Sequence, residues 1–94
     1  MARLGADALE RLEPVLRQLR ALEPLQERSP GTFACHGAPL LHFHSFATGL
    51  VADVKADGRW LRYDVEGAGA RRRLLSDVRR IVAGDATRLA GRPT

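Results

Sequence analysis

Between Leu4 and Glu27, apolar side chains recur every three or four positions with charged residues between them, which predicts an amphipathic helix. Its apolar side consists of Leu9, Leu12, Val15, Leu16, Leu19 and Leu22. Pro14 cannot donate a backbone hydrogen bond, so we expect the helix to kink there or to restart with Pro14 as its first residue. Pro24 is expected to end the regular helix or to begin a last short turn, and Ser29-Pro30-Gly31 then breaks the pattern.

From Thr32 to Glu66 the hydrophobic period changes to two, which predicts strands rather than helix. We expect four strands, at residues 32–36, 40–46, 49–56 and 59–66. Asp57-Gly58 favours a type I′ turn between the last two strands, because that turn needs positive φ at both central residues. The strands on either side of this turn then pair in a single register.

This register separates an apolar face from a mostly polar one. It places Val54 opposite Leu61 on the apolar face and Asp53 opposite Arg62 on the other. A slip of one residue would move every side chain to the wrong face, so the pattern specifies the register strongly. The residues that we expect to point into the core from the last strand are Leu61, Tyr63 and Val65.

A turn at Ala47-Thr48 extends both faces to the preceding strand, with His42 opposite Asp53 and His44 opposite Val51. The same register continues the apolar face through Leu41 and Phe43, which lie opposite Val54 and Ala52. The polar face therefore gathers both histidines next to Asp53.

The first hairpin has two possible loops. A three-residue loop, Gly37-Ala38-Pro39, places Phe33 and Cys35 on the apolar face, whereas a two-residue loop would turn both outward beside the histidines. Because Phe and Cys are commonly buried, we expect the three-residue loop.

The last helix is predicted over residues 69–83. Its apolar side holds Leu74, Leu75, Val78, Ile81 and Val82, and we place the arginines and Asp77 on the opposite side. Residues 85–94 are small, polar and basic, and are expected to form a disordered tail. The sequence thus predicts one α+β domain, residues 1–84: an N-terminal helix, a four-stranded antiparallel meander and a C-terminal helix. Both helices cover one sheet face, which leaves the other face open.

The distribution of basic residues suggests nucleic acid as a possible partner. Fifteen basic residues against eleven acidic ones give a net charge of +4, and the whole excess lies in residues 48–94. Arg72, Arg73, Arg79 and Arg80 could neutralise phosphates, so weak nucleic-acid binding by the last helix is one alternative. Because +4 is modest for a nucleic-acid binder, a solvated helix face explains these arginines more simply.

Composition indicates the class of protein and its expected location. A hydrophobic fraction of 45% and a charged fraction of 28% are typical of a soluble globular domain. No apolar run approaches the roughly 18 residues that cross a membrane, so we expect no membrane association. The single cysteine, Cys35, excludes an internal disulfide framework, and we expect a cytoplasmic protein.

The open sheet face carries the candidate chemistry. His42, Asp53 and Arg62 form one row, with His44 and Trp60 beside it. An imidazole next to a carboxylate suits general acid–base catalysis, and an adjacent arginine could hold an anionic substrate. The simpler interpretation is a surface ladder of hydrogen bonds that only stabilises the sheet, because each pair of opposite charges across neighbouring strands contributes about 0.2–1 kcal/mol.

Histidines could also bind a metal ion. His42 and His44 lie on one face of a strand, and His36 precedes them. Zinc requires three or four such ligands in a tetrahedral arrangement, and the preferred register buries Cys35 on the other face. We therefore expect no bound metal and no cofactor.

These observations favour a small binding or interaction domain that is not an enzyme and that forms a homodimer or binds another protein through the open face. The first alternative is a small histidine-based enzyme or metal-binding protein centred on His42, His44, Asp53 and Arg62. The second is weak nucleic-acid binding by the arginine-rich helix.

Overall fold

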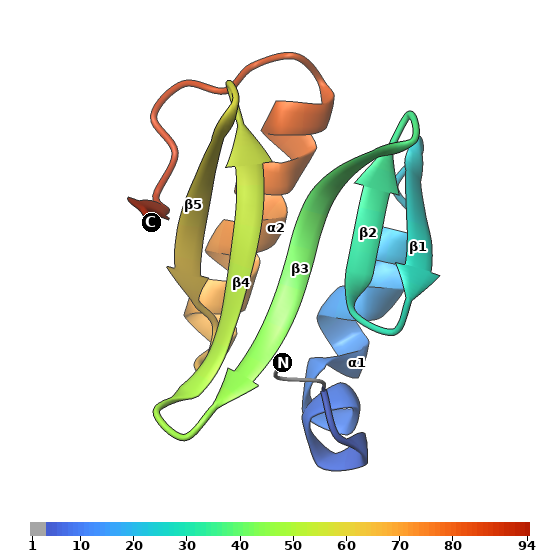
Figure 1. The fold of residues 1–94 in the computed structure, drawn as a ribbon, viewed down its shortest axis with the longest axis vertical. Coiled ribbons are helices and arrows are strands. Elements are labelled where there is room, and N and C mark those ends of the chain that lie inside the picture. Colours follow the sequence, from blue (N-terminus) through green and yellow to red (C-terminus); the bar gives the residue numbers. More distant parts are fainter. Residues whose placement is uncertain (1–3) are drawn as a thin grey trace.

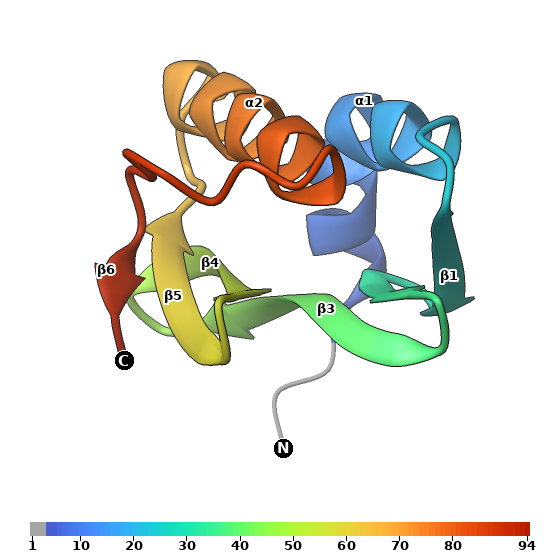
Figure 2. The ribbon, with the colours of Figure 1, turned by 90° about the horizontal axis from the view of Figure 1, so that it is seen from above.

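Two helices lie on the same face of an antiparallel sheet (Figures 1 and 2). This computed structural model describes residues 4–94. The elements are α1 (Ala6–Arg20), β1 (Leu25–Ser29), β2 (Thr32–Cys35), β3 (Ala38–Phe46), β4 (Gly49–Ala56), β5 (Arg59–Asp64), α2 (Ala68–Val82) and β6 (Arg92–Pro93). The strands follow one another in the sheet in chain order. The α+β class is confirmed, but the sheet has six strands and not four.

The first helix is shorter than predicted. α1 continues through Pro14 but ends at Arg20, and the segment after Pro24 forms β1. Pro24 has no N–H to donate to the carbonyl of Arg20, and its ring would clash with that carbonyl in a continued helix, so a helix past Arg20 is disfavoured. The chain then folds back so that Glu27 of β1 accepts a hydrogen bond of 2.6 Å from Arg20, which also contacts Glu13 at 3.0 Å. Two carboxylates around one guanidinium join β1 to α1.

The hairpin between β2 and β3 corrects the predicted loop. Its turn has two residues, His36 and Gly37, both with positive φ (51° and 82°), and Cys35 pairs with Ala38. The register then shifts at Leu40, so that Phe33 lies opposite Leu41. This β-bulge returns Phe33 to the inner face, where it is fully buried. Phe33 is therefore buried as expected, but by a bulge and not by a longer loop.

The register of β3, β4 and β5 is as predicted. Asp57 and Gly58 both have positive φ (51° and 75°), which is the geometry of a type I′ turn. Asp53 lies opposite both His42 and Arg62. The inner residues Val54, Leu61, Tyr63 and Val65 are buried beneath the helices. The Asp57-Gly58 turn therefore fixes which side chains form the core.

The pattern of α2 predicts Asp77 on the exposed side of the helix. This prediction is wrong, because Asp77 is buried and only 6% exposed. Tyr63 donates its O–H to Asp77 Oδ2 at 2.8 Å, and Ala90 donates its N–H to the same oxygen at 2.7 Å. Arg80 contacts the other oxygen at 3.3 Å. Burial, followed by the contact with Asp77, raises the pKa of Tyr63 above its ordinary value. Asp77 is therefore a buried acceptor that joins α2, β5 and the C-terminal segment.

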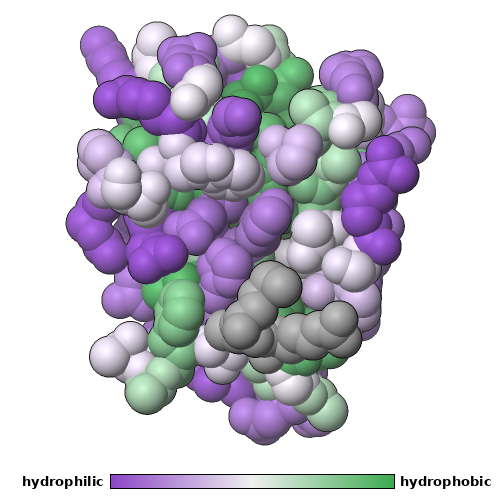
Figure 3. All heavy atoms as spheres, in the orientation of Figure 1, coloured by the Kyte–Doolittle hydropathy of each residue, from purple (hydrophilic) through white to green (hydrophobic). Residues whose placement is uncertain are grey.

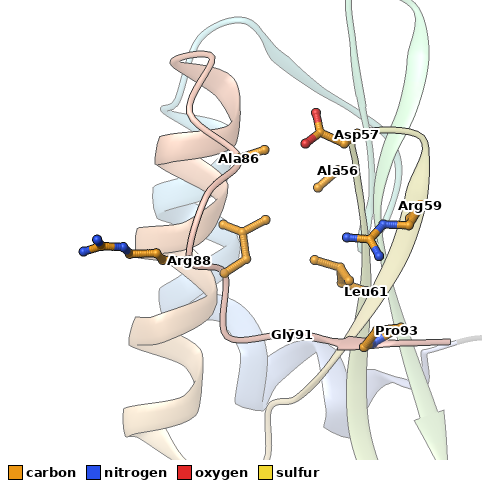
Figure 4. Close-up of a pocket in the computed structure, with 9 residues that line it drawn as sticks. Ala56, Asp57, Arg59, Leu61, Ala86, Arg88, Gly91 and Pro93 are labelled. Carbon is orange, nitrogen blue, oxygen red and sulfur yellow. The ribbon is translucent and has the colours of Figure 1, made fainter.

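The C-terminal segment, residues 85–94, was expected to be disordered but adds β6 to the sheet beside β5. A Cβ atom at Gly91 would lie 2.8 Å from Cβ of Leu61, so only glycine fits where this segment crosses β5. The segment and the β4–β5 hairpin enclose a pocket of about 280 Å³, which Arg59 points toward and Arg88 points away from (Figure 4). Within residues 4–94, neither helix is long and apolar enough to cross a membrane.

We expect Asp77→Asn to destabilise the fold by about 2 kcal/mol, because an amide cannot accept from the Tyr63 hydroxyl, the Ala90 amide and Arg80 in the same way. Urea unfolding measures this loss. Amide hydrogen exchange should accelerate in residues 86–93 more than in β3 and β4. Asp57→Asn, an exposed turn substitution, is the control. Unchanged protection of residues 86–93 in Asp77→Asn would contradict the role of this carboxylate.

Candidate functional site

A polar row crosses the sheet on the face opposite the helices. The strand registers place Thr32, His42, Asp53, Arg62 and Arg92 side by side from β2 to β6. Side chains of a strand alternate between its two faces, so His44, Lys55 and Trp60 share this face with the row. We call this surface the open face. It contains all the residues that the sequence proposed as a ligand or partner surface.

Asp53 is the centre of the open face. Arg62 donates from Nε to Oδ1 at 2.9 Å and from Nη2 to Oδ2 at 3.0 Å, a bidentate pair. The hydrogen bond from Arg62 lowers the pKa of the Asp53 carboxyl, although partial burial acts against it. The Asp53 side chain is only 15% exposed. Asp53 and Arg62 thus form a fixed ion pair, as the predicted register implied.

The imidazole that contacts Asp53 is not that of its register partner. Nε2 of His44 lies 3.1 Å from Oδ2 of Asp53, although His44 is paired with Val51. His42 instead meets the ring of Trp60 edge to face, with 5.3 Å between ring centroids. Diagonal neighbours across strands are within reach of long and aromatic side chains, which explains the exchange of roles. Register alone could not choose between the two histidines.

Four rings form a continuous line on the open face. Ring centroids are 5.7 Å apart between Phe46 and His44, 6.1 Å between His44 and His42, and 5.3 Å between His42 and Trp60. We call these four residues the aromatic strip. Phe46 is not among the surface residues predicted from the sequence, although it follows His42 and His44 at the same two-residue spacing.

Each end of the aromatic strip lies next to a cation. Lys55 Nζ is 5.8 Å from the centroid of Trp60, and Cζ of Arg62 is 5.5 Å from that of Phe46. Phe46 is 42% exposed. Among residues 4–94, no other large hydrophobic side chain is exposed to solvent. Figure 3 shows hydrophilic residues over the middle of this face and a small hydrophobic area toward the β3–β4 turn. The open face is therefore a mixed surface of rings and charges.

The three histidines do not come together. His36 lies in the β2–β3 turn, whereas His42 lies four residues into β3, which corresponds to about 13 Å along a strand. Among residues 4–94, no three His, Cys, Asp or Glu side chains form a group that could hold a metal ion. Cys35 is half-buried and packs against the core, away from the open face.

The arginines of α2 have different surroundings. Arg80 contacts Asp77 and Asp85, and Arg79 donates to Gln18 of α1. Arg72 lines a pocket of about 220 Å³ between the two helices. Arg73 lines another pocket, of about 140 Å³, beside β5 and β6. A nucleic-acid surface on α2 stays a prediction, but the four arginines do not form one stripe.

The contact between His44 and Asp53 has the geometry of a general base held by a carboxylate. The same carboxylate is bound by Arg62 through both oxygens, which favours its charged form. This arrangement suits a rigid structural network as well as proton transfer. The histidine-based enzyme therefore stays an alternative prediction.

Comparisons with models of protein families, with curated proteins and with solved structures give no significant match to this chain.

We expect Asp53→Asn to lower stability at pH 7 by about 1 kcal/mol, because Arg62 is 36% exposed and solvent screens the ion pair. The lowered pKa of Asp53 means that the stabilisation is present above the unfolded value of about 3.9 and is lost as pH falls through the folded value. The difference between the two proteins should therefore shrink between about pH 5 and pH 2. Urea unfolding at several pH values measures it, and a difference independent of pH would contradict the ion pair.

Proposed function

We propose that this protein is a binding domain that is not an enzyme, and that a second copy of the chain covers its open face. The observation that carries this proposal is the aromatic strip, which ends in the exposed ring of Phe46. Rings and arginine are the side chains that most often provide binding energy at the centres of protein interfaces. We retain the cytoplasmic location expected from the single cysteine as part of the proposal.

The size of the open face supports this partner. The molecule measures 33 × 25 Å in the view onto the sheet (Figure 1). A standard protein interface buries roughly 800 Å² on each partner, so a second copy would have to cover most of the open face. A small domain with a core on only one side of its sheet gains burial when a second copy covers the other side.

The open face also complements itself. Consider a two-fold axis that runs parallel to the sheet just outside the open face, perpendicular to the strands, and between the row of His42 and the row of His44. Because Arg62 lies in the row of His42, and Asp64 in the row of His44, the axis places Arg62 of one copy opposite Asp64 of the other. It also reverses the aromatic strip end to end, so that Phe46 approaches the Trp60 end of the second copy. Opposite charges and rings then meet in both directions, as an isologous interface requires.

Sedimentation equilibrium over a range of concentrations tests the homodimer. We expect a species with twice the mass of the chain, and Phe46→Ser should raise its dissociation constant about tenfold or more. Asp64→Lys should also weaken the dimer, because it places a like charge opposite Arg62 of the second copy.

Ser76→Lys is the matched control for the added charge, because Ser76 is exposed on α2 on the other side of the molecule. Urea unfolding of the variants confirms that each one folds. A wild-type chain that stays monomeric at millimolar concentration would reject the homodimer. Equal weakening by Asp64→Lys and Ser76→Lys would reject the proposed axis.

A further inference from the structure

The edge of the sheet next to β5 is only partly covered. β6 has two residues, which pair with Leu61 and Arg62, and the chain leaves the sheet beyond them. Val65 donates its N–H to Leu50 of β4. Because backbone groups alternate in direction along a strand, the N–H of Asp64 points to the opposite edge, beyond the end of β6. A backbone donor therefore faces the uncovered part of this edge.

A pocket of about 140 Å³ lies at this edge. It is lined by Arg62, Tyr63, Asp64, Ala70, Arg73, Ala90 and Arg92. These residues come from β5, the first turns of α2 and the C-terminal segment, so the docked C-terminal segment forms one wall of the pocket. A water molecule occupies about 30 Å³, so the pocket has room for a small polyatomic ion.

The arginines of this pocket are not equivalent. Arg62 is held by Asp53, as described above. Neither Arg73 nor Arg92 makes an ion pair with a carboxylate of the described residues. Arg92 lies directly opposite Arg62 in the sheet, and like charges at such positions repel one another. An anion in the pocket would reduce this repulsion.

We infer that this pocket binds a tetrahedral oxyanion, and specifically a phosphate group, between Arg73 and Arg92. Two guanidinium groups provide forked donors that match phosphate oxygens, and the N–H of Asp64 provides a third. The carboxylate of Asp64 is the one negative group of the pocket lining, so the two free arginines exceed it in charge. Two lining residues, Arg62 and Asp64, also belong to the proposed dimer interface, whereas Arg73 and Arg92, which we expect to bind the anion, are not part of the aromatic strip.

Titration with inorganic phosphate at constant ionic strength, followed by NMR of the backbone amides, tests the site. We expect saturable shifts of the amides of Asp64, Ala70, Arg73, Ala90 and Arg92, with millimolar affinity. Arg73→Gln and Arg92→Gln should each raise the dissociation constant about tenfold, because each removes one charged donor. Asp64→Asn should lower it, because it removes the repelling carboxylate and keeps the backbone N–H.

Arg59→Gln is the matched control, since Arg59 is exposed on β5 but outside this pocket. Repeating the titration in Phe46→Ser separates the result from dimerisation. Titration with glycerol phosphate and with a single-stranded oligonucleotide distinguishes the sources of the phosphate group, and we expect the monoester to bind at least as tightly as the free ion. The absence of amide shifts at 50 mM phosphate would reject the site. So would an equal loss of phosphate affinity in Arg59→Gln and in the Arg73 and Arg92 variants. An affinity for the oligonucleotide more than tenfold above that for the monoester would also reject it.

Discussion

Both the core and the open face follow from the pairing of β3 with β4 and of β4 with β5. Two short turns, Ala47-Thr48 and Asp57-Gly58, set a register that sends every second side chain to the helices. The same register collects His42, His44, Asp53 and Arg62 on the open face. A shift of one residue would bury the ion pair and expose the core. Core and candidate site are therefore two consequences of one pairing.

The buried carboxylate of Asp77 has a second organising role. Through Tyr63 and the backbone of Ala90 it ties the C-terminal segment to α2 and β5. That tie positions β6, and the docked segment forms one wall of the pocket that contains Arg92. The C-terminal residues are thus part of the domain and determine what its sheet edge presents to solvent.

The open face combines rigidity with exposure. Asp53 is shielded and held by two partners, so the centre of the face has a fixed geometry, whereas Phe46 at one end is accessible. Binding to a surface that is already ordered loses less conformational entropy than binding to a flexible one. This property supports recognition of a partner more directly than it supports catalysis, for which Asp53 is already engaged by Arg62.

Local sequence patterns predict the α+β class, the last helix and the pairing of β3 with β4 and of β4 with β5, because alternation and turn chemistry act over a few neighbouring residues. They could also have indicated the burial of Asp77, which lies between Leu74 and Val78 in the apolar stripe of α2. Only the tertiary contacts show which histidine contacts Asp53, that Leu40 forms a bulge, and that residues 25–29 and 92–93 add β1 and β6 at the two edges of the sheet. These features depend on contacts between different elements, such as Arg20 of α1 with Glu27 of β1 and Asp77 of α2 with Ala90 of the C-terminal segment, and on side-chain directions that no local pattern encodes.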